Sequence, residues 1–286
     1  MSPGPLEGIR ALNLGVNLPA PVAGDRLREL GADVLKVEPP GGDPLEASAP
    51  EWYRRLTAGQ AVARLDLKAP GDRARLDAEL GRCDLLLTSS RPAALERLGL
   101  GRPALAGRFP RLVQVAIVGH PRPRHDVPGH DLTYMARHGL LSPPDLPRTL
   151  IADLAGAERA VSAALALLLG RERGVGPRSA EVALSDAAAA FAGPWEHGLT
   201  ADGGLVGGGL PAYGLYEARD GWVAVAAIEP HFQERLQAEL GVPRLGRDEL
   251  ARAFRARTPA EWEAWAGERG IPLAAVGDVH GERSDR

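Results

Sequence analysis

The sequence is poor in the residues from which disulfides, metal centres and membrane spans are built. Cys83 is its only cysteine, which excludes an internal disulfide and any cysteine-rich metal cluster. No apolar run reaches the roughly 18 residues of a membrane-spanning helix, and we find no signal peptide before the first predicted strand. We therefore expect a cytoplasmic protein that does not contact a membrane.

Net charge and lysine are scarce as well. The formal net charge is -3, so no overall attraction to nucleic acid is expected. Lysine occurs only at Lys36 and Lys68. Arginine, whose planar fork suits phosphate and carboxylate groups, therefore supplies most of the positive charge for binding an anionic ligand. What the chain does have is apolar side chains. Of its 286 residues 44% are hydrophobic, enough for a sizeable core and for two domains.

The first part of the chain alternates between short apolar runs and helical patterns. The strands predicted there cover 9–14, 33–38, 84–88 and 112–118, and the predicted helices cover 22–30 and 72–80. Strands separated by helices favour a parallel sheet with right-handed crossovers. We predict an α/β fold with a large Rossmann-like domain.

A change of composition divides the rest of the chain. A long and largely buried helix is predicted at 151–170. The segment 201–211 is too rich in glycine for a regular element and is typical of a domain boundary. We predict a large domain over 1–200 and a smaller α/β domain over 201–286.

The histidines are the first candidates for chemistry. Four of the seven follow one another in one stretch, mostly in five-residue steps interrupted by prolines: His120, His125, His130 and His138. This spacing fits neither one helix face nor a zinc motif, so no metal site is predicted. The first strand-to-helix turn lacks the G-x-G-x-x-G of a dinucleotide site, and no G-x-S-x-G hydrolase motif is present.

His130 and Asp153 each admit a structural and a chemical interpretation. His130 lies between Gly129 and Asp131, which suits the start of a helix, yet an imidazole is also the natural base near neutral pH. Asp153 lies at the entrance of the predicted long helix, where its carboxylate can cap backbone N–H groups or serve as a catalytic acid or nucleophile. The residue patterns leave both interpretations open.

Several segments along the chain form a series in a fixed order. They are GIRALNL, LRELGADVLKVEPPGGDP, LDLKAPGDRARL, CDLLLTSSRPAALERLGL, FPRLVQVAIVGH, PGHDLTY and GGGLPAYGLYEARDGWVAVAAIEPHF. Together they resemble the family III CoA-transferase superfamily, and within it the branch of the α-methylacyl-CoA racemases. The resemblance extends over essentially the whole chain.

The resemblance implies roles for three residues. In the racemase-like branch, the histidine at His130 and the aspartate at Asp153 stand on opposite sides of the substrate α-carbon, and the glutamate at Glu229 supports the histidine. One group removes the α-proton of a 2-methylacyl-CoA thioester while the other donates a proton to the opposite face. We expect backbone amides at the start of the helix after Asp153 to stabilise the enolate oxygen, and Asp131 to orient His130 or bind nearby backbone.

Two alternatives stay open. In family members that transfer CoA between acids, the aspartate at Asp153 is a nucleophile that forms anhydride and thioester intermediates. The other alternative is a member that has lost catalysis and binds only CoA or a partner. Two departures favour it: RRLTAGQAVAR stands where relatives have a basic loop, and relatives continue past the end of this sequence in a segment that returns to the large domain.

The resemblance also implies how the substrate is held. No metal or redox cofactor is expected beyond the CoA of the acyl-CoA substrate, and family members form interlocked homodimers. The expected CoA contacts run from the LDLK segment to the GHDLTY segment, and arginines among them suit the phosphates. These contacts are Leu65, Asp66, Leu67, Lys68, Ser89, Ser90, Arg91, Arg97, Gly129, Asp131 and Tyr134.

Overall fold

The computed structural model describes residues 4–277. The prediction that a C-terminal return segment is missing concerns the end of the chain, which lies outside the described residues. The chain forms two compact units, of which the first ends at Ala192 and the second begins at Gly193. The glycine-rich segment 201–211 lies within the second unit.

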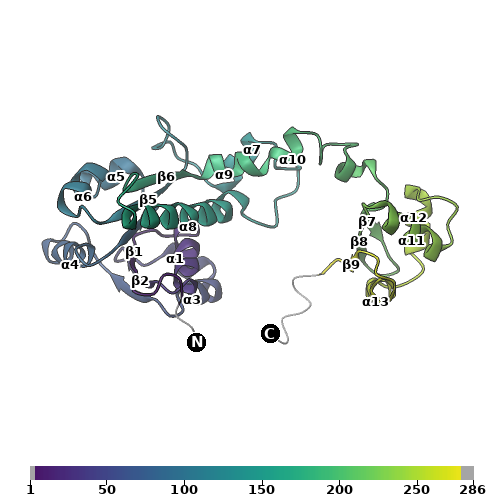
Figure 1. Ribbon diagram of the computed structural model, residues 1–286, viewed down its shortest axis with the longest axis horizontal. Helices are drawn as coiled ribbons and strands as arrows, with labels where there is room; N and C mark the ends of the chain where they lie inside the picture. The colour runs from purple at the N-terminus through teal and green to yellow at the C-terminus, as the bar shows by residue number, and fades with distance from the viewer. Residues whose placement is uncertain (1–3, 278–286) are drawn as a thin grey trace. The chain divides into compact units, whose positions relative to one another are not determined.

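The first unit contains a six-stranded parallel sheet (Figure 1). Its elements are β1 (Arg10–Asn13), α1 (Pro19–Glu29), β2 (Asp33–Glu38), α2 (Pro44–Ser48), α3 (Pro50–Thr57), β3 (Ala61–Arg64), α4 (Pro70–Leu80), β4 (Leu85–Thr88), α5 (Pro92–Arg97), α6 (Arg102–Arg108), β5 (Val113–Val118), α7 (Asp131–Arg137), α8 (Ile151–Glu172), β6 (Ser179–Ala183) and α9 (Leu184–Phe191). The strand order is β3-β2-β1-β4-β5-β6. The predicted α/β class is confirmed.

Helices cover both faces of this sheet because alternate strand residues point to opposite sides. Ala11 and Leu87 belong to one core cluster with residues of α1 and α8, whereas Leu12 and Leu86 belong to another with residues of α4, α5 and α6. Four alanines of α8, buried against the strands, let this helix approach the sheet closely: Ala152, Ala157, Ala160 and Ala164. Both faces are buried, as a parallel sheet requires.

The second unit is smaller and contains an antiparallel sheet in the order β7-β8-β9. Its elements are α10 (Gly193–Glu196), the π-helical turn η1 (Leu205–Gly209), β7 (Tyr213–Glu217), β8 (Trp222–Ala226), α11 (Pro230–Leu240), α12 (Arg247–Phe254), α13 (Pro259–Arg269) and β9 (Leu273–Ala275). Phe254 and Trp262 pack edge to face in its core, and the Trp262 indole N–H donates to the Phe254 carbonyl at 2.7 Å.

No helix within residues 4–277 is both long and apolar enough to cross a membrane. The same residues contain no group of three or more His, Cys, Asp or Glu side chains arranged to hold a metal ion.

Candidate active site

A cavity of about 290 Å³ opens where the parallel strands of the first unit end. Val16 and Asn17 follow β1, Ser89 follows β4, and Gly119 follows β5, and all four line it. The strand order reverses between β1 and β4, and ligands of such sheets bind beyond the carboxyl ends of the strands at this kind of reversal. The fold therefore places the cavity where a substrate site is expected.

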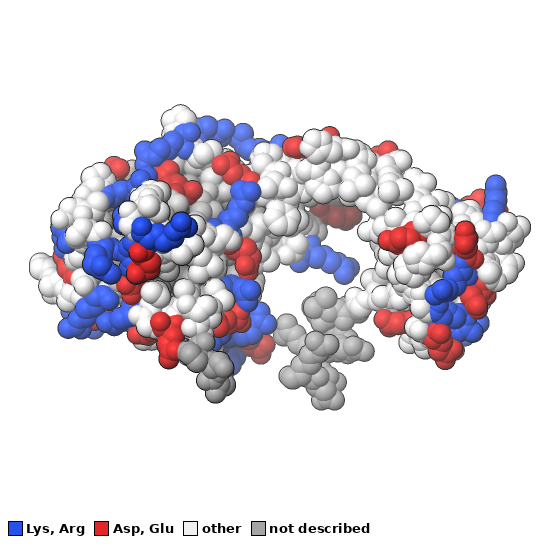
Figure 2. Space-filling model, in the orientation of Figure 1, with Lys and Arg blue, Asp and Glu red and all other residues white. Residues whose placement is uncertain are grey.

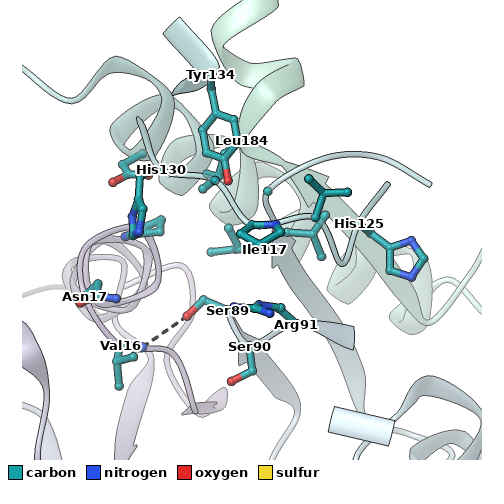
Figure 3. A pocket seen from close by; sticks show the side chains of 17 residues that line it. Val16, Asn17, Ser89, Ser90, Arg91, Ile117, His125, His130, Tyr134 and Leu184 are labelled. Carbon is teal, nitrogen blue, oxygen red and sulfur yellow. Dashed lines mark hydrogen bonds between the residues drawn. The ribbon is translucent and has the colours of Figure 1, made fainter. Parts of the chain in front are cut away.

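His130 lines this cavity and is the residue immediately before α7. Its backbone N–H donates to the Thr133 hydroxyl at 3.1 Å, and that hydroxyl donates back to the His130 carbonyl at 2.8 Å. Thr133 thus completes the start of the helix, and the imidazole forms no hydrogen bond with any residue in the described part of the chain. The ring is free to meet a ligand (Figure 3).

Asp153 lines the same cavity from the first turn of α8, so the fold brings it to the cavity with His130, which precedes α7. The helix begins at Ile151, as predicted, so Asp153 is its third residue, and the interpretation of its side chain as the cap is wrong. The expected oxyanion site just after Asp153 is also wrong at its first donor, since the Leu154 amide already donates to the Leu150 carbonyl at 3.0 Å. The Asp153 side chain is left without a structural hydrogen bond among the described residues.

Burial and neighbouring charge shift the proton affinity of Asp153. Its pKa is raised to about 6, first by burial and then by the negative charge of Asp131, while the charge of His130 acts in the opposite direction. Asp131 is itself buried, with 4% of the residue exposed. One of its oxygens, Oδ1, accepts the Asp153 backbone N–H at 3.0 Å, whereas Oδ2 is buried without a partner among the described residues.

Tyr134 brings a hydroxyl to the cavity from α7. The residue is 2% exposed, and its hydroxyl points into the cavity beside His130 (Figure 3). Burial and the charges of Asp153 and Asp131 raise its pKa, so the phenol stays protonated. Gly129 makes room for it, because a β-carbon there would lie 2.6 Å from the tyrosine ring.

A second hollow of about 440 Å³ adjoins the first, and Val16 and Ser90 line both. Residues 65–68 line this second hollow, as do Pro39 and Pro40. The first cavity is lined by Ser89, Ser90, Arg91, Gly129 and Tyr134 from the predicted CoA contacts. The sequence prediction therefore named residues of two adjoining hollows.

The remaining predicted site residues lie elsewhere. Asp131, expected as a CoA contact, is buried and lines neither hollow. Arg97 is exposed in the last turn of α5 and lines neither hollow. Glu229 is exposed and precedes α11, where Pro230 occupies the first helical position, as in an ordinary helix start. Because Glu229 belongs to the second unit, its support of His130 stays a prediction.

Basic and acidic side chains are interspersed over the visible face of the first unit (Figure 2). An anionic ligand at the cavity therefore depends on individual cations. Arg91 is one of these, because it lines the cavity, is exposed and forms no ion pair with any residue between 4 and 277.

The sequence analysis missed an ionic network, the Lys36 cluster, which comprises the buried Lys36, Glu38, Asp43 and Tyr53 and the exposed Arg64. The Lys36 ammonium, fully buried, lies 2.7 Å from Asp43 Oδ2 and 3.2 Å from Glu38 Oε1. Glu38 Oε1 accepts the Tyr53 hydroxyl at 2.7 Å, and Arg64 Nε lies 3.5 Å from Glu38 Oε2. The one signal in the sequence is a lysine within an apolar strand, where it has no access to water.

The Lys36 cluster also holds the loop that lines the cavity. Asp43 Oδ1 accepts the backbone N–H of Asn17 at 2.8 Å, and the Lys36 ammonium donates to the Gly15 carbonyl at 3.2 Å. Asn17 has φ +67°, the only positive φ of a non-glycine residue within 4–277. Such a conformation is strained and persists only when the surroundings fix it, which is what these two bonds do.

Residues 6–286 match the sequence model of CoA-transferase family III. The chain belongs to this family. An alpha-methylacyl-CoA racemase from Homo sapiens is 30% identical to it, over 90% of this chain and 74% of the relative. A succinyl-CoA–D-citramalate CoA-transferase from Chloroflexus aurantiacus is 29% identical, over 89% of this chain and 69% of the relative. The resemblance inferred from the sequence segments is confirmed, and both activities occur among relatives of this family III chain at nearly equal identity.

Solved structures share the fold of this family member. A hypothetical protein from Mycobacterium tuberculosis superposes with a TM-score of 0.78 at 25% identity, over 97% of this chain and 85% of that chain. A CAIB/BAIF family protein from Brucella suis gives a TM-score of 0.80 at 19% identity, over 98% and 85%.

Proposed function

We propose that the chain is an acyl-CoA racemase or epimerase that moves a proton at the α-carbon of a 2-methylacyl-CoA thioester. The observation that carries the proposal is that His130 and Asp153, brought together from two segments, line one cavity without a structural hydrogen bond from either side chain to a described residue. Inverting a carbon centre requires two groups, one that removes the proton and another that returns one to the opposite face.

The proton affinity of Asp153 suits this exchange of roles. Its pKa is raised to about 6, so this carboxyl gives or takes a proton near neutral pH without a large energetic cost. The α-proton leaves to the base, the planar enolate takes a proton from the acid, and the two groups end with their protonation states exchanged.

The other groups of the two hollows serve the thioester and the CoA. The protonated Tyr134 hydroxyl is placed to donate a hydrogen bond to the developing enolate oxygen. In this proposal Arg91, which lines the first cavity, and residues 65–68, which line the second hollow, bind the CoA portion. CoA enters as part of the substrate, with no further cofactor. A homodimer in which Glu229 supports His130 remains part of this proposal.

The test is the exchange of the α-proton in deuterium oxide, with the stereochemistry of a pure 2-methylacyl-CoA enantiomer followed over time. The wild-type protein should incorporate deuterium and form the opposite enantiomer. His130→Ala should lower both rates by about 10³-fold, in the range for loss of a general acid or base, with an unchanged circular dichroism spectrum. Deuterium incorporation without inversion, or an unaffected His130→Ala variant, contradicts the proposal.

CoA transfer is the second candidate, favoured by the Asp153 carboxylate in the cavity and by the similarity to a CoA-transferase. In that reaction the Asp153 oxygen attacks the thioester carbonyl, CoA leaves as the thiolate, and an acyl anhydride forms. Hydroxylamine should then trap the acyl-enzyme and inactivate the protein only in the presence of an acyl-CoA. His130→Ala should leave most of this transfer intact.

A further inference from the structure

Asp131 is a buried carboxylate beside the half-buried Asp153, and the proposed chemistry gives Asp131 no role. Asp131 is the first residue of α7 and Asp153 is the third residue of α8, and their helices pack together. Asp131 Oδ1 accepts the backbone N–H of Asp153 at 3.0 Å. Because the helix bearing Asp153 has no side-chain cap at Leu150, this bond supplies an acceptor for one of its free N–H groups.

The second oxygen of Asp131 makes the arrangement costly. Oδ2 is buried without a hydrogen-bond partner in the described part of the chain, and the residue is 4% exposed. An amide would accept the same N–H bond and bury no charge. A structural role in holding the helix therefore leaves the charge of Asp131 without an explanation.

The groups that face Asp153 are few. Asp131, His130 and Tyr134 come from α7 and the residue before it. Arg91 and His125 line the same cavity from the loops after β4 and β5. Of these, Asp131 is the one that carries a negative charge against the Asp153 carboxyl, and His130 is the one whose positive charge opposes it.

We propose that Asp131 is a positioning residue with two separable actions: its Oδ1 holds the backbone of Asp153 at the cavity, and its charge favours the protonated form of the Asp153 carboxyl. The second action keeps a proton available on Asp153 when the reaction needs it as the acid, since two like charges in one buried site resist joint ionisation. This inference deepens the proposed function and rests on it for the use made of the proton.

Two variants separate the two actions. Asp131→Asn keeps an oxygen acceptor for the Asp153 N–H and removes the charge, whereas Asp131→Ala removes both. Titration of Asp153 is followed by ¹³C NMR of protein labelled at aspartate carboxyl carbons, with the Asp153 signal assigned from its loss in Asp153→Asn. This readout does not depend on activity, so it tests the inference even if the protein transfers CoA instead of racemising.

The Asp153 titration midpoint should fall towards the ordinary aspartate range in both variants. At a pH above the midpoint, each unit by which the midpoint falls lowers the fraction of protonated Asp153 about tenfold. The pH profile of α-proton exchange should therefore move to lower pH by the same number of units as the midpoint. The rate of α-proton exchange should be several-fold lower in Asp131→Ala than in Asp131→Asn, because only the asparagine still accepts the Asp153 N–H bond. The control is Asp126→Asn. Asp126 Oδ1 accepts the Ala93 backbone N–H at 3.1 Å, as Asp131 accepts that of Asp153, but Asp126 does not face Asp153. The Asp153 titration midpoint in this variant should match that of the wild type.

An unchanged Asp153 midpoint in Asp131→Asn overturns the inference. Equal exchange rates in Asp131→Asn and Asp131→Ala overturn the first of the two actions. Failure of the proposed function looks different, because the midpoint still falls in Asp131→Asn while the wild-type protein shows no inversion at the α-carbon.

Discussion

Two clusters of buried or half-buried carboxylates lie in the first unit, and they differ in how their charge is compensated. In the Lys36 cluster, the carboxylates of Glu38 and Asp43 meet an ammonium, a phenol, a guanidinium and backbone amides. Asp153 lines the cavity and Asp131 is buried beside it, and neither forms an ion pair with lysine or arginine anywhere in residues 4–277. Burying a charge costs several kcal/mol unless it is paired. The paired cluster can therefore only hold a shape, whereas the unpaired one is able to exchange a proton.

The largest effect should follow from unpairing the first cluster. Lys36→Met leaves Glu38 and Asp43 buried without their shared ammonium, and removing one partner of a buried pair costs about 3–5 kcal/mol. The free energy of unfolding, from urea denaturation followed by circular dichroism, should fall by that amount.

The control is the only other lysine. Lys68 is exposed, so Lys68→Met should change the free energy of unfolding by no more than about 0.5 kcal/mol. A loss below 1 kcal/mol for Lys36→Met would mean that the Lys36 ammonium does not stabilise the buried Glu38 and Asp43 carboxylates. The proposed difference between the two clusters would then be wrong.

The strands β4 and β5 were predictable because each is mostly apolar and fully buried. The edge strand β3 (Ala61–Arg64) was missed because it is mostly exposed and reads AVAR, without an apolar run or a clear alternation. The Lys36 cluster was missed for a different reason. Lysine is almost never fully buried, and the partners Gly15 and Asp43 approach Lys36 only through the fold.

The site was predicted by resemblance rather than by residue pattern. Pattern alone gave His130 and Asp153 a structural role as readily as a chemical one. The structure separates these roles through contacts that spacing does not reveal: Thr133 completes the helix start that His130 was expected to serve, and Asp131 accepts the N–H of Asp153 from another helix. The second of these contacts joins residues 22 positions apart and appears only after folding.

Removing the charge of the second cluster should stabilise the protein. The pKa of Asp153 is raised to about 6 in the fold, above the roughly 3.9 of an unfolded aspartate. Between these values the folded state binds more protons, so stability falls as pH rises from about 4 to about 6 and the loss is complete above that. Asp153→Asn never ionises and escapes this loss.

The measurement is the difference in unfolding free energy between Asp153→Asn and the wild type at pH 4 and at pH 7.5. It should grow by about 2 kcal/mol with rising pH. Asp145→Asn is a matched control, because the Asp145 side chain is exposed and forms no hydrogen bond or ion pair within the described residues, and its difference should stay constant. A difference for Asp153→Asn that shrinks with pH would place Asp153 among the compensated carboxylates.

The smallest effect concerns the arginine nearest to the cavity. Arg91 lines it from the residue before α5, whereas Arg97, in the last turn of α5, lines neither hollow. If Arg91 binds the CoA portion and does not compensate Asp153, Arg91→Ala should raise the KM for acyl-CoA about tenfold, which corresponds to about 1.4 kcal/mol. The maximum rate and its pH profile should remain as in the wild type.

Arg97→Ala supplies the matched comparison for Arg91→Ala, and its KM should rise less than twofold because an exposed charge outside the hollows contributes little. The pH profile of Arg91→Ala decides what the arginine does. A profile moved to higher pH would show that its cation had been favouring the ionised form of Asp153. Asp153 would then have a compensating cation in Arg91. Both clusters would be charge-compensated, and they would differ only in how far the cation lies from the carboxylates.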